Sequence, residues 1–161
     1  MKNNDFHTTK ALWDFFRNYT NKCDEKKKQD IDKSACEEAA KKNIYEVECS
    51  SDYSGTTESL SKMSGTGVIN LKETTDYVNI NIPITEKGSY KVYVGYNSVY
   101  GFKQINCSVN GVSGTANLGV SSDDDKIDKL GETLVGTFNF SAGENVVNLT
   151  PIWTWAVVDY V

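Results

Sequence analysis

The sequence has little of the material on which most catalytic centres depend. Its 161 residues contain one histidine, His7, and no Gly-x-Ser-x-Gly segment, so no serine or cysteine hydrolase with a histidine base is predicted. Acidic side chains are available, but no spacing pairs two of them as a glycosidase requires. The candidates are Glu58, Glu73, Glu86, Asp123, Asp124, Asp125 and Glu132. We therefore expect no catalytic residues in this chain.

Basic patches and long apolar runs are also scarce. The formal net charge is -5, and the one basic run, Lys26 to Lys28, is flanked by acidic residues. Binding to nucleic acid requires a basic face, so no nucleic-acid partner is expected. No stretch approaches the roughly 18 apolar residues of a membrane span, and residues 1–30 lack the order of a signal peptide. We expect no membrane partner, and if the protein is exported its signal lies outside this chain.

The four cysteines, Cys23, Cys36, Cys49 and Cys107, form no Cys-x-x-Cys pair. Zinc binding and thioredoxin-type redox chemistry therefore have little support. Cys23 and Cys36 bracket a polar segment that a disulfide could close, and a bridge from Cys49 to Cys107 is also possible. Spacing alone leaves the connectivity open.

The composition changes near residue 43. Before it, apolar side chains recur at helical spacing, at Leu12, Phe15, Phe16 and Tyr19. Residues 24–42 are strong helix formers with few apolar side chains. Residues 1–43 are therefore predicted to be a helical tail or linker of a preceding domain.

From residue 44 onward the chain is a series of short β-prone runs separated by turn residues. The runs are 44–49, 67–71, 77–84, 89–96, 104–109, 114–118, 133–140, 145–149 and 156–161. Asn110-Gly111 predicts a type I′ hairpin, and the polar segment 119–132 predicts a surface loop. Short strands without helices between them are typical of a sandwich or jelly roll. The predicted fold class is all-β, an antiparallel β-sandwich jelly roll over residues 44–161 with an N-terminal helical extension.

Three acidic residues lie on the first and last strands of this predicted sandwich. Glu46 and Glu48 stand at i and i+2 on the first predicted strand, so both side chains point to one face, and Asp159 stands on the last. First and last strands of antiparallel sandwiches commonly pair. Converging carboxylates are suitable ligands for Ca²⁺, and the alternative is an exposed strand face without a metal.

The chain closes with two tryptophans and a carboxylate at alternating positions. If residues 153–161 are extended, Trp153, Trp155 and Asp159 point to the same face. Two such indoles beside Pro151 favour a flat surface on which a sugar ring can stack. The alternative is that both indoles belong to the sandwich core.

The order of motifs from residue 44 to the end resembles carbohydrate-binding module family 35, especially the mannan-binding type attached to β-mannanases. The matching segments are YEVE at 45–48, SGTGV at 64–68, GSYKV at 88–92, YGFK at 100–103, VNG at 109–111, FSAGENVV at 140–147 and WTWAVVDYV at 153–161. Two positions depart from the mannan-type pattern. Thr154 stands where glycine is usual, and Val68 stands where tyrosine is frequent.

The resemblance implies a non-catalytic jelly-roll module that tethers a secreted, extracellular enzyme to plant cell-wall polysaccharide, with β-mannan or galactomannan as the expected glycan. It also implies a structural Ca²⁺ held by Glu46, Glu48 and Asp159. The positions that match the family's carbohydrate-binding residues are Trp153, Trp155, Tyr100, Lys103, Gln104 and Asn106.

Residues 5–16 resemble the last helix of an α/β-hydrolase esterase. The expected context is therefore a covalently linked catalytic domain, with the module itself a monomer, and His7 is not carried over as catalytic. Three alternatives stay open: binding to xylan or uronic-acid glycans in place of mannan, a calcium-bound module that docks protein, and a hydrolase with an unrecognised site.

Overall fold

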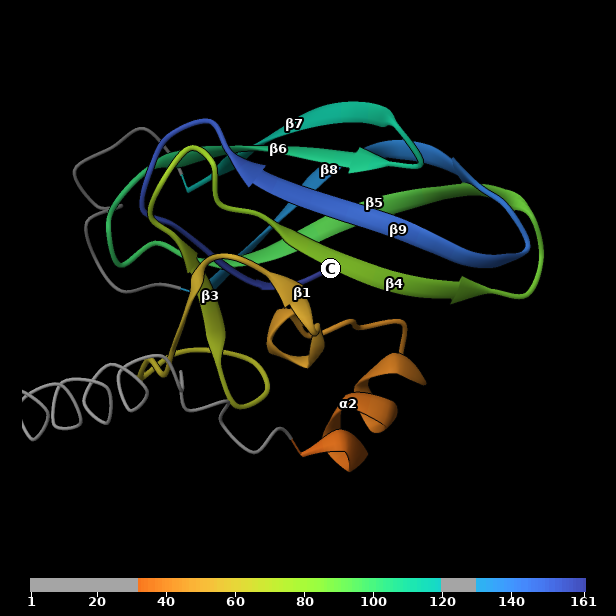
Figure 1. Cartoon of the computed structure of the whole chain (residues 1–161), viewed down its shortest axis with the longest axis horizontal. Coiled ribbons are helices and arrows are strands. Elements are labelled where there is room, and N and C mark those ends of the chain that lie inside the picture. The colour runs from red at the N-terminus through yellow and green to blue at the C-terminus, as the bar shows by residue number, and fades with distance from the viewer. Residues whose placement is uncertain (1–31, 120–129) are drawn as a thin grey trace, which may run out of the picture. The chain divides into compact units, whose positions relative to one another are not determined.

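In the computed structural model, which describes residues 32–119 and 130–161, two antiparallel five-stranded sheets face each other (Figure 1). One sheet has the strand order β1-β4-β9-β6-β7 and the other the order β2-β3-β10-β5-β8. The elements are α2 (Lys33–Ala40), the 3-10 helix η1 (Val47–Cys49), β1 (Asp52–Tyr53), β2 (Thr56–Glu58), β3 (Val68–Leu71), β4 (Val78–Ile84), β5 (Gly88–Asn97), β6 (Lys103–Val109), β7 (Val112–Leu118), β8 (Leu130–Phe140), β9 (Gly143–Pro151) and β10 (Ala156–Tyr160). The predicted all-β sandwich is confirmed.

The core lies between the two sheets and follows from strand alternation. In β6, Ile105, Cys107 and Val109 are buried, whereas the residues between them face outward and are partly exposed. The same repeat buries one face of β4 and of β9. Each fully buried aliphatic side chain contributes about 1.5–3 kcal/mol relative to an exposed one, so this repeat drives the sheets together.

The first predicted strand, 44–49, is not a strand. Glu46 forms a single antiparallel bridge with Tyr160, and the chain then turns into η1. The bridge brings the first and last segments together as expected, but the tight turn directs Glu46 and Glu48 inward. The short strands β1 and β2 were not predicted, because they are polar and only two and three residues long.

The predicted hairpin at Asn110-Gly111 is confirmed. These two residues join β6 to β7 and have φ angles of 50° and 85°. A type I′ turn needs positive φ at both central positions, which asparagine and glycine adopt with the least strain.

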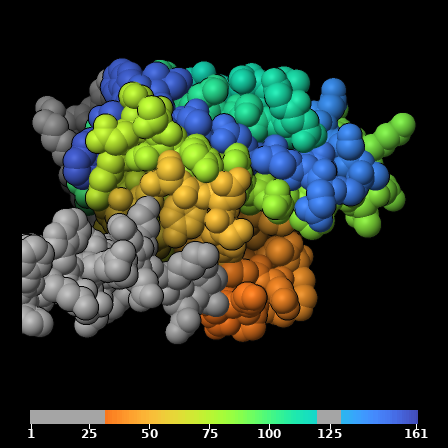
Figure 2. All heavy atoms as spheres, viewed as in Figure 1, coloured from red at the N-terminus to blue at the C-terminus, as the bar shows by residue number. Residues whose placement is uncertain are grey.

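A disulfide joins Cys36 to Cys49, so both pairings considered from the sequence are wrong. Cys107 is a buried free thiol in the core, and burial raises its pKa to about 12. Cys36 belongs to α2, which is capped at its start by the Asp32 carboxylate. The bridge ties α2 to the sandwich, and in Figure 2 the orange helix lies against the gold segment that contains η1.

Several predictions fall on residues outside the described ranges. They concern Cys23, His7, the apolar stripe at 12–19 and most of the polar segment 119–132. Within the described ranges, no helix has the length and apolar character needed to cross a membrane. Residues 32–161 form one compact unit, which includes α2.

Candidate functional site

Three carboxylates meet around the loop of residues 64–67, which precedes β3. The Ser64 backbone N–H donates to Asp159 Oδ2 at 2.8 Å, and the Ser64 hydroxyl donates to Glu46 Oε1 at 2.7 Å. The backbone N–H groups of Thr66 and Gly67 donate to Glu48 Oε1 at 2.8 and 3.1 Å. One short loop therefore holds the three acidic residues that the sequence predicts as metal ligands.

These carboxylates are buried, with exposed fractions of 7% for Glu46, 5% for Glu48 and 0% for Asp159. One oxygen of each has no hydrogen-bond partner: Glu46 Oε2, Glu48 Oε2 and Asp159 Oδ1. Among the described residues no lysine forms an ion pair with any of them. A buried carboxylate charge that has one partnerless oxygen and no cation beside it is costly, so the three groups favour a cation among them.

The pKa shifts of Asp159 and Glu46 support the same conclusion. Burial, reinforced by the charges of Glu46 and Glu48, raises the pKa of Asp159 to about 7. Burial also raises the pKa of Glu46, against the lowering effect of the Ser64 hydroxyl. Concentrated negative charge with hard oxygen donors suits a hard cation such as Ca²⁺.

The side chains alone do not form a ready metal centre. No group of three or more acidic, histidine or cysteine side chains in the part of the chain described is arranged to hold a metal ion by itself. Ca²⁺ takes six to eight oxygen ligands and accepts backbone carbonyls among them. The three partnerless carboxylate oxygens can therefore be part of a calcium site whose other ligands are backbone carbonyls. Each of those oxygens is buried and therefore needs a partner.

Gly65 is required at the centre of this loop. Its φ is +56°, and a Cβ atom there would lie 2.3 Å from Glu48 Oε1 and 3.1 Å from Glu46 Cδ. A side chain at this position would push the two carboxylates apart, so the loop and the carboxylates fit each other only with glycine.

The two tryptophans lie in the loop between β9 and β10. Trp153 is 50% exposed and Trp155 is 44% exposed, so neither belongs to the core. Trp155 has a φ of +65°, which breaks the two-residue repeat of an extended strand. The expectation that both indoles share a strand face with Asp159 is therefore wrong: Asp159 is fully buried in β10.

Each indole packs against a different aromatic side chain. Trp153 packs edge-on against Phe102, with ring centroids 5.3 Å apart, and Trp155 packs edge-on against Tyr100, with centroids 5.2 Å apart. The backbone N–H groups of Ile152 and Trp153 both donate to the Gln104 carbonyl, at 2.9 and 3.1 Å. These contacts fix the loop against the start of β6.

Trp155 stands beside charged and polar groups from β2, from β3 and the residue after it, and from the loop between β5 and β6. Lys72 Nζ lies 5.3 Å from the Trp155 ring centroid and 3.1 Å from Glu58 Oε1. Asn70 donates to Glu58 Oε1 at 3.0 Å, and the Tyr100 hydroxyl lies 3.5 Å from Glu58 Oε2. Asn70 is fully buried and its Oδ1 has no partner. We call Trp155, Tyr100, Glu58, Asn70 and Lys72 the Trp155 cluster.

Sequence reasoning missed Glu58, Asn70 and Lys72 as site residues. They come together because β2 pairs with β3, with Thr56 opposite Asn70 and Glu58 opposite Val68. No spacing in the sequence signals that pairing, because β2 is a three-residue polar strand.

The other predicted binding residues lie along β6. Lys103 is the first residue of β6 and is partly exposed. Gln104 donates its side-chain amide to Asn117 Oδ1 at 3.0 Å, while its carbonyl holds the Trp153 loop. Asn106 lies further along the outer face, between Thr115 and Thr150 of the neighbouring strands.

A β-sandwich with aromatic side chains exposed on its loops and a buried carboxylate cluster has the features of a carbohydrate-binding module. The family model described as "Carbohydrate binding module (family 35)" matches residues 43–161, and the chain belongs to this family. It is thus a binding module and not a catalytic domain. Among curated proteins no sequence match was found.

Solved structures share the fold. The GH26-CBM35 β-(1,4)-mannanase of Podospora anserina is 21% identical, with a TM-score of 0.63 over 73% of this chain and 26% of that chain. The exo-β-1,3-galactanase of Phanerochaete chrysosporium is 23% identical, with a TM-score of 0.60 over 73% of this chain and 28% of that one. A family 35 module from Clostridium thermocellum is 22% identical, with a TM-score of 0.60 over 73% of this chain and 92% of that one. The chain thus spans about a quarter of the two enzyme chains and nearly all of the isolated module.

Proposed function

We propose that this module binds β-mannan or a related hemicellulose and holds a secreted plant-cell-wall-degrading enzyme on its substrate, as a monomer covalently linked to a catalytic domain. The observation that carries the proposal is the Trp155 cluster, in which an exposed indole stands beside a fixed carboxylate and a lysine. Family membership supplies the carbohydrate class, and the geometry suggests where the sugar binds.

The cluster offers the two kinds of contact that a pyranose needs. The Trp155 face stacks on the apolar C–H face of a sugar ring. The Glu58 carboxylate accepts hydrogen bonds from sugar hydroxyls and is held in place by Lys72 and Asn70, so little side-chain freedom is lost on binding. Lys72 supplies N–H donors to the same ring. The exposed face is small, so we expect modest affinity for a short oligosaccharide.

We further propose that Ca²⁺ stabilises the fold at Glu46, Glu48 and Asp159. Three partnerless carboxylate oxygens, each buried, support this assignment. When bound, the metal would neutralise the clustered charge. The 64–67 loop would orient the carboxylates toward the metal, and Gly65 leaves room between them.

Mannan is the preferred glycan because the motif order resembles the mannan-binding type, and a mannanase is among the proteins with a similar module. A galactanase is among them too, so the choice among glycans needs a direct test. One observation favours the second candidate, xylan or another uronic-acid glycan: Lys72 places a cation beside the Trp155 ring, where a sugar carboxylate could pair with it.

Affinity electrophoresis in galactomannan, glucomannan and xylan gels tests the proposal. We expect the wild-type module to be retarded in the mannan gels and Trp155→Ala to lose this retardation. Val112→Ala, an exposed apolar control at the β6–β7 hairpin, should be retarded like the wild type. Retardation in xylan alone would favour the second candidate. Unretarded migration in all three gels would refute polysaccharide binding and favour protein docking.

A further inference from the structure

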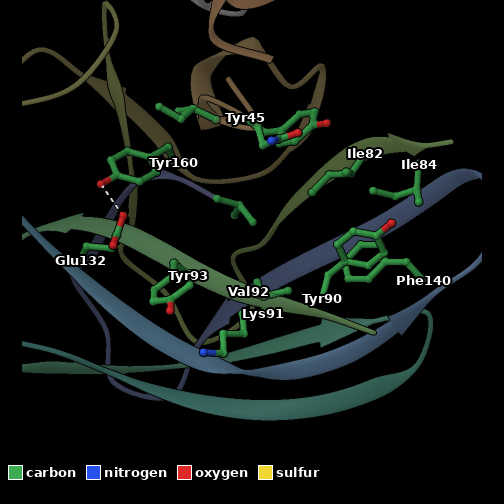
Figure 3. Close-up of a pocket in the computed structure, with 13 residues that line it drawn as sticks. Tyr45, Ile82, Ile84, Tyr90, Lys91, Val92, Tyr93, Glu132, Phe140 and Tyr160 are labelled. Atoms are coloured by element: carbon green, nitrogen blue, oxygen red, sulfur yellow. Dashed lines mark hydrogen bonds between the residues drawn. The ribbon is translucent and has the colours of Figure 1, made fainter. Parts of the chain in front are cut away.

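A second hollow on the sandwich shares no residue with the Trp155 cluster. Its volume is about 360 Å³, and its walls come from β4, β5, β8, β10 and residues 43–45. Figure 3 shows the labelled side chains around a common space, with Tyr160 and Tyr90 toward opposite ends. We call it the tyrosine groove and define it by Tyr45, Tyr90, Lys91, Tyr93, Glu132 and Tyr160.

The groove exists because two strands extend beyond their partners. β10 pairs with β5 only opposite residues 95–97, so no described strand covers that edge of β5 from Gly88 to Val94. β1 pairs with β4 only at Val78 and Asn79, which leaves the edge of β4 open over Ile82 and Ile84. The groove lies where these two edges approach each other.

The walls of the groove are fixed by the fold. Tyr160 lies directly on β5 because residue 95 is glycine: a Cβ atom there would stand 2.3 Å from Tyr160 Cε1. The Tyr160 hydroxyl donates to Glu132 Oε2 at 3.0 Å. Tyr45 and Val161 exchange backbone hydrogen bonds of 2.8 and 3.0 Å, which hold the segment at Tyr45 in place. The groove is therefore preformed, as ligand sites usually are.

The open edge of β5 is poorly suited to another strand. Lys91 stands in the middle of it, and a β-bulge interrupts its pairing with β8 between Val92 and Tyr93. A lysine and a bulge on an edge strand are features that hinder strand addition. An extended peptide or a second copy of the chain is therefore disfavoured as the occupant.

The lining instead matches a ligand with both an apolar ring face and hydroxyl groups. Tyr90 and Tyr93 are each 38% exposed, so their rings are open to contact. Lys91 forms no ion pair with a described residue, and Glu132 Oε1 accepts no hydrogen bond from one. A purely apolar ligand would bury both charges without partners, which is costly.

Tyrosine hydroxyls supply further polar groups. The Tyr160 hydroxyl donates to Glu132 Oε2, and its oxygen can accept a hydrogen bond from a sugar hydroxyl. The Tyr45 hydroxyl can donate to or accept from a sugar hydroxyl.

We propose that the tyrosine groove is a second saccharide-binding site, which takes neutral pyranose residues of a polysaccharide. From Gly95, beneath Tyr160, to Tyr90 the strand spans roughly 17 Å, which suits a short length of glycan chain. Two sites on one module would raise its apparent affinity for a long polysaccharide above that for a short oligosaccharide, because the second contact becomes intramolecular. Saccharide binding in the groove does not depend on the Trp155 cluster.

Residue-resolved NMR titration of Trp155→Ala with mannohexaose, xylohexaose and cellohexaose tests this inference. We expect backbone amide shifts confined to residues 88–95 and to their neighbours in the groove for at least one of the three sugars. Adding Tyr93→Ala should weaken that binding about tenfold, in line with the loss of one aromatic contact.

Leu134→Ala is the matched control, because Leu134 pairs with Tyr93, is exposed and does not line the groove. It should leave the shifts unchanged, and unchanged unfolding midpoints would show that both variants are folded. The absence of groove shifts with all three sugars, or equal losses in the two variants, would overturn the proposal. Shifts in the groove of the wild-type module without shifts around Trp155 would support the groove and refute the Trp155 cluster as a sugar site.

Discussion

Removing calcium should lower the stability of the module substantially, because the fold buries three carboxylates around one loop. A ligand that binds only the native state stabilises it by about 2.7 kcal/mol when its free concentration is about 100 times Kd. For a domain of this size about 1 kcal/mol corresponds to roughly 4 °C in Tm. We therefore expect Tm to fall by roughly 10 °C when excess calcium is replaced by a chelator.

The assay is thermal unfolding followed by tryptophan fluorescence, with calcium, with magnesium and with EGTA. Metal content is measured after dialysis against chelator, so that a slowly released ion is detected. Asp159→Asn is the informative variant, since it removes one buried charge but keeps an acceptor for the Ser64 N–H. In EGTA it should be at least as stable as the wild type, and it should lose the response to calcium.

Equal Tm values for wild-type protein with calcium and with EGTA, in samples shown to be free of metal, would refute the calcium assignment. A calcium response retained in full by Asp159→Asn would refute the assignment of Asp159 as a ligand. Stabilisation by magnesium equal to that by calcium would argue against a flexible site of high coordination number.

Three further predictions follow from the same geometry. In EGTA, Asp159 binds a proton more readily in the folded state than in the unfolded one, since its pKa is raised from 3.8 to about 7. The free energy of unfolding without metal should therefore fall as pH rises from about 4 to about 7. The stabilisation by calcium should be larger at pH 8 than at pH 5, and unfolding curves at the two pH values measure it. Gly65→Ala should destabilise the module more than Gly111→Ala, because both positions have positive φ but only the first lies against the carboxylates; equal denaturation midpoints would contradict this reasoning. Replacing Cys36 and Cys49 with serine should lower the free energy of unfolding by about 3 kcal/mol, as for a loop of about 15 residues, and leave glycan retardation unchanged, whereas lost retardation would mean that α2 supports the sugar site.

The sandwich was predictable because its strands alternate. The two-residue repeat in β4, β6 and β9 is visible in the sequence and is the same repeat that buries the core. The hairpin at Asn110-Gly111 was predictable for a local reason, the positive φ of both residues. These features depend on residues that are neighbours in the sequence, so a single sequence is enough to predict them.

The errors concern features that depend on tertiary contacts. The run 44–49 has the composition of a strand, but burial of Glu46 and Glu48 against the 64–67 loop turns the chain into η1. The Cys36–Cys49 bridge follows from where α2 packs, which spacing does not encode.

The residues of the candidate site were predictable only in part. Trp153 and Trp155 were identified from their spacing and from the family resemblance, but the conformation of their loop depends on backbone hydrogen bonds to the Gln104 carbonyl. Lys72 and Glu58 join Trp155 only after β2 has paired with β3. Pairs of this kind leave no local pattern in a single sequence.

Polysaccharide binding through Trp155 and its neighbours can be measured on a glycan array, probed in calcium with the chain and with its Trp155→Ala variant. We expect binding to β-mannan oligosaccharides that is at least about tenfold weaker in the variant, as for an aromatic residue at the centre of a binding site. Binding to no glycan, or equal binding by both proteins, would contradict it.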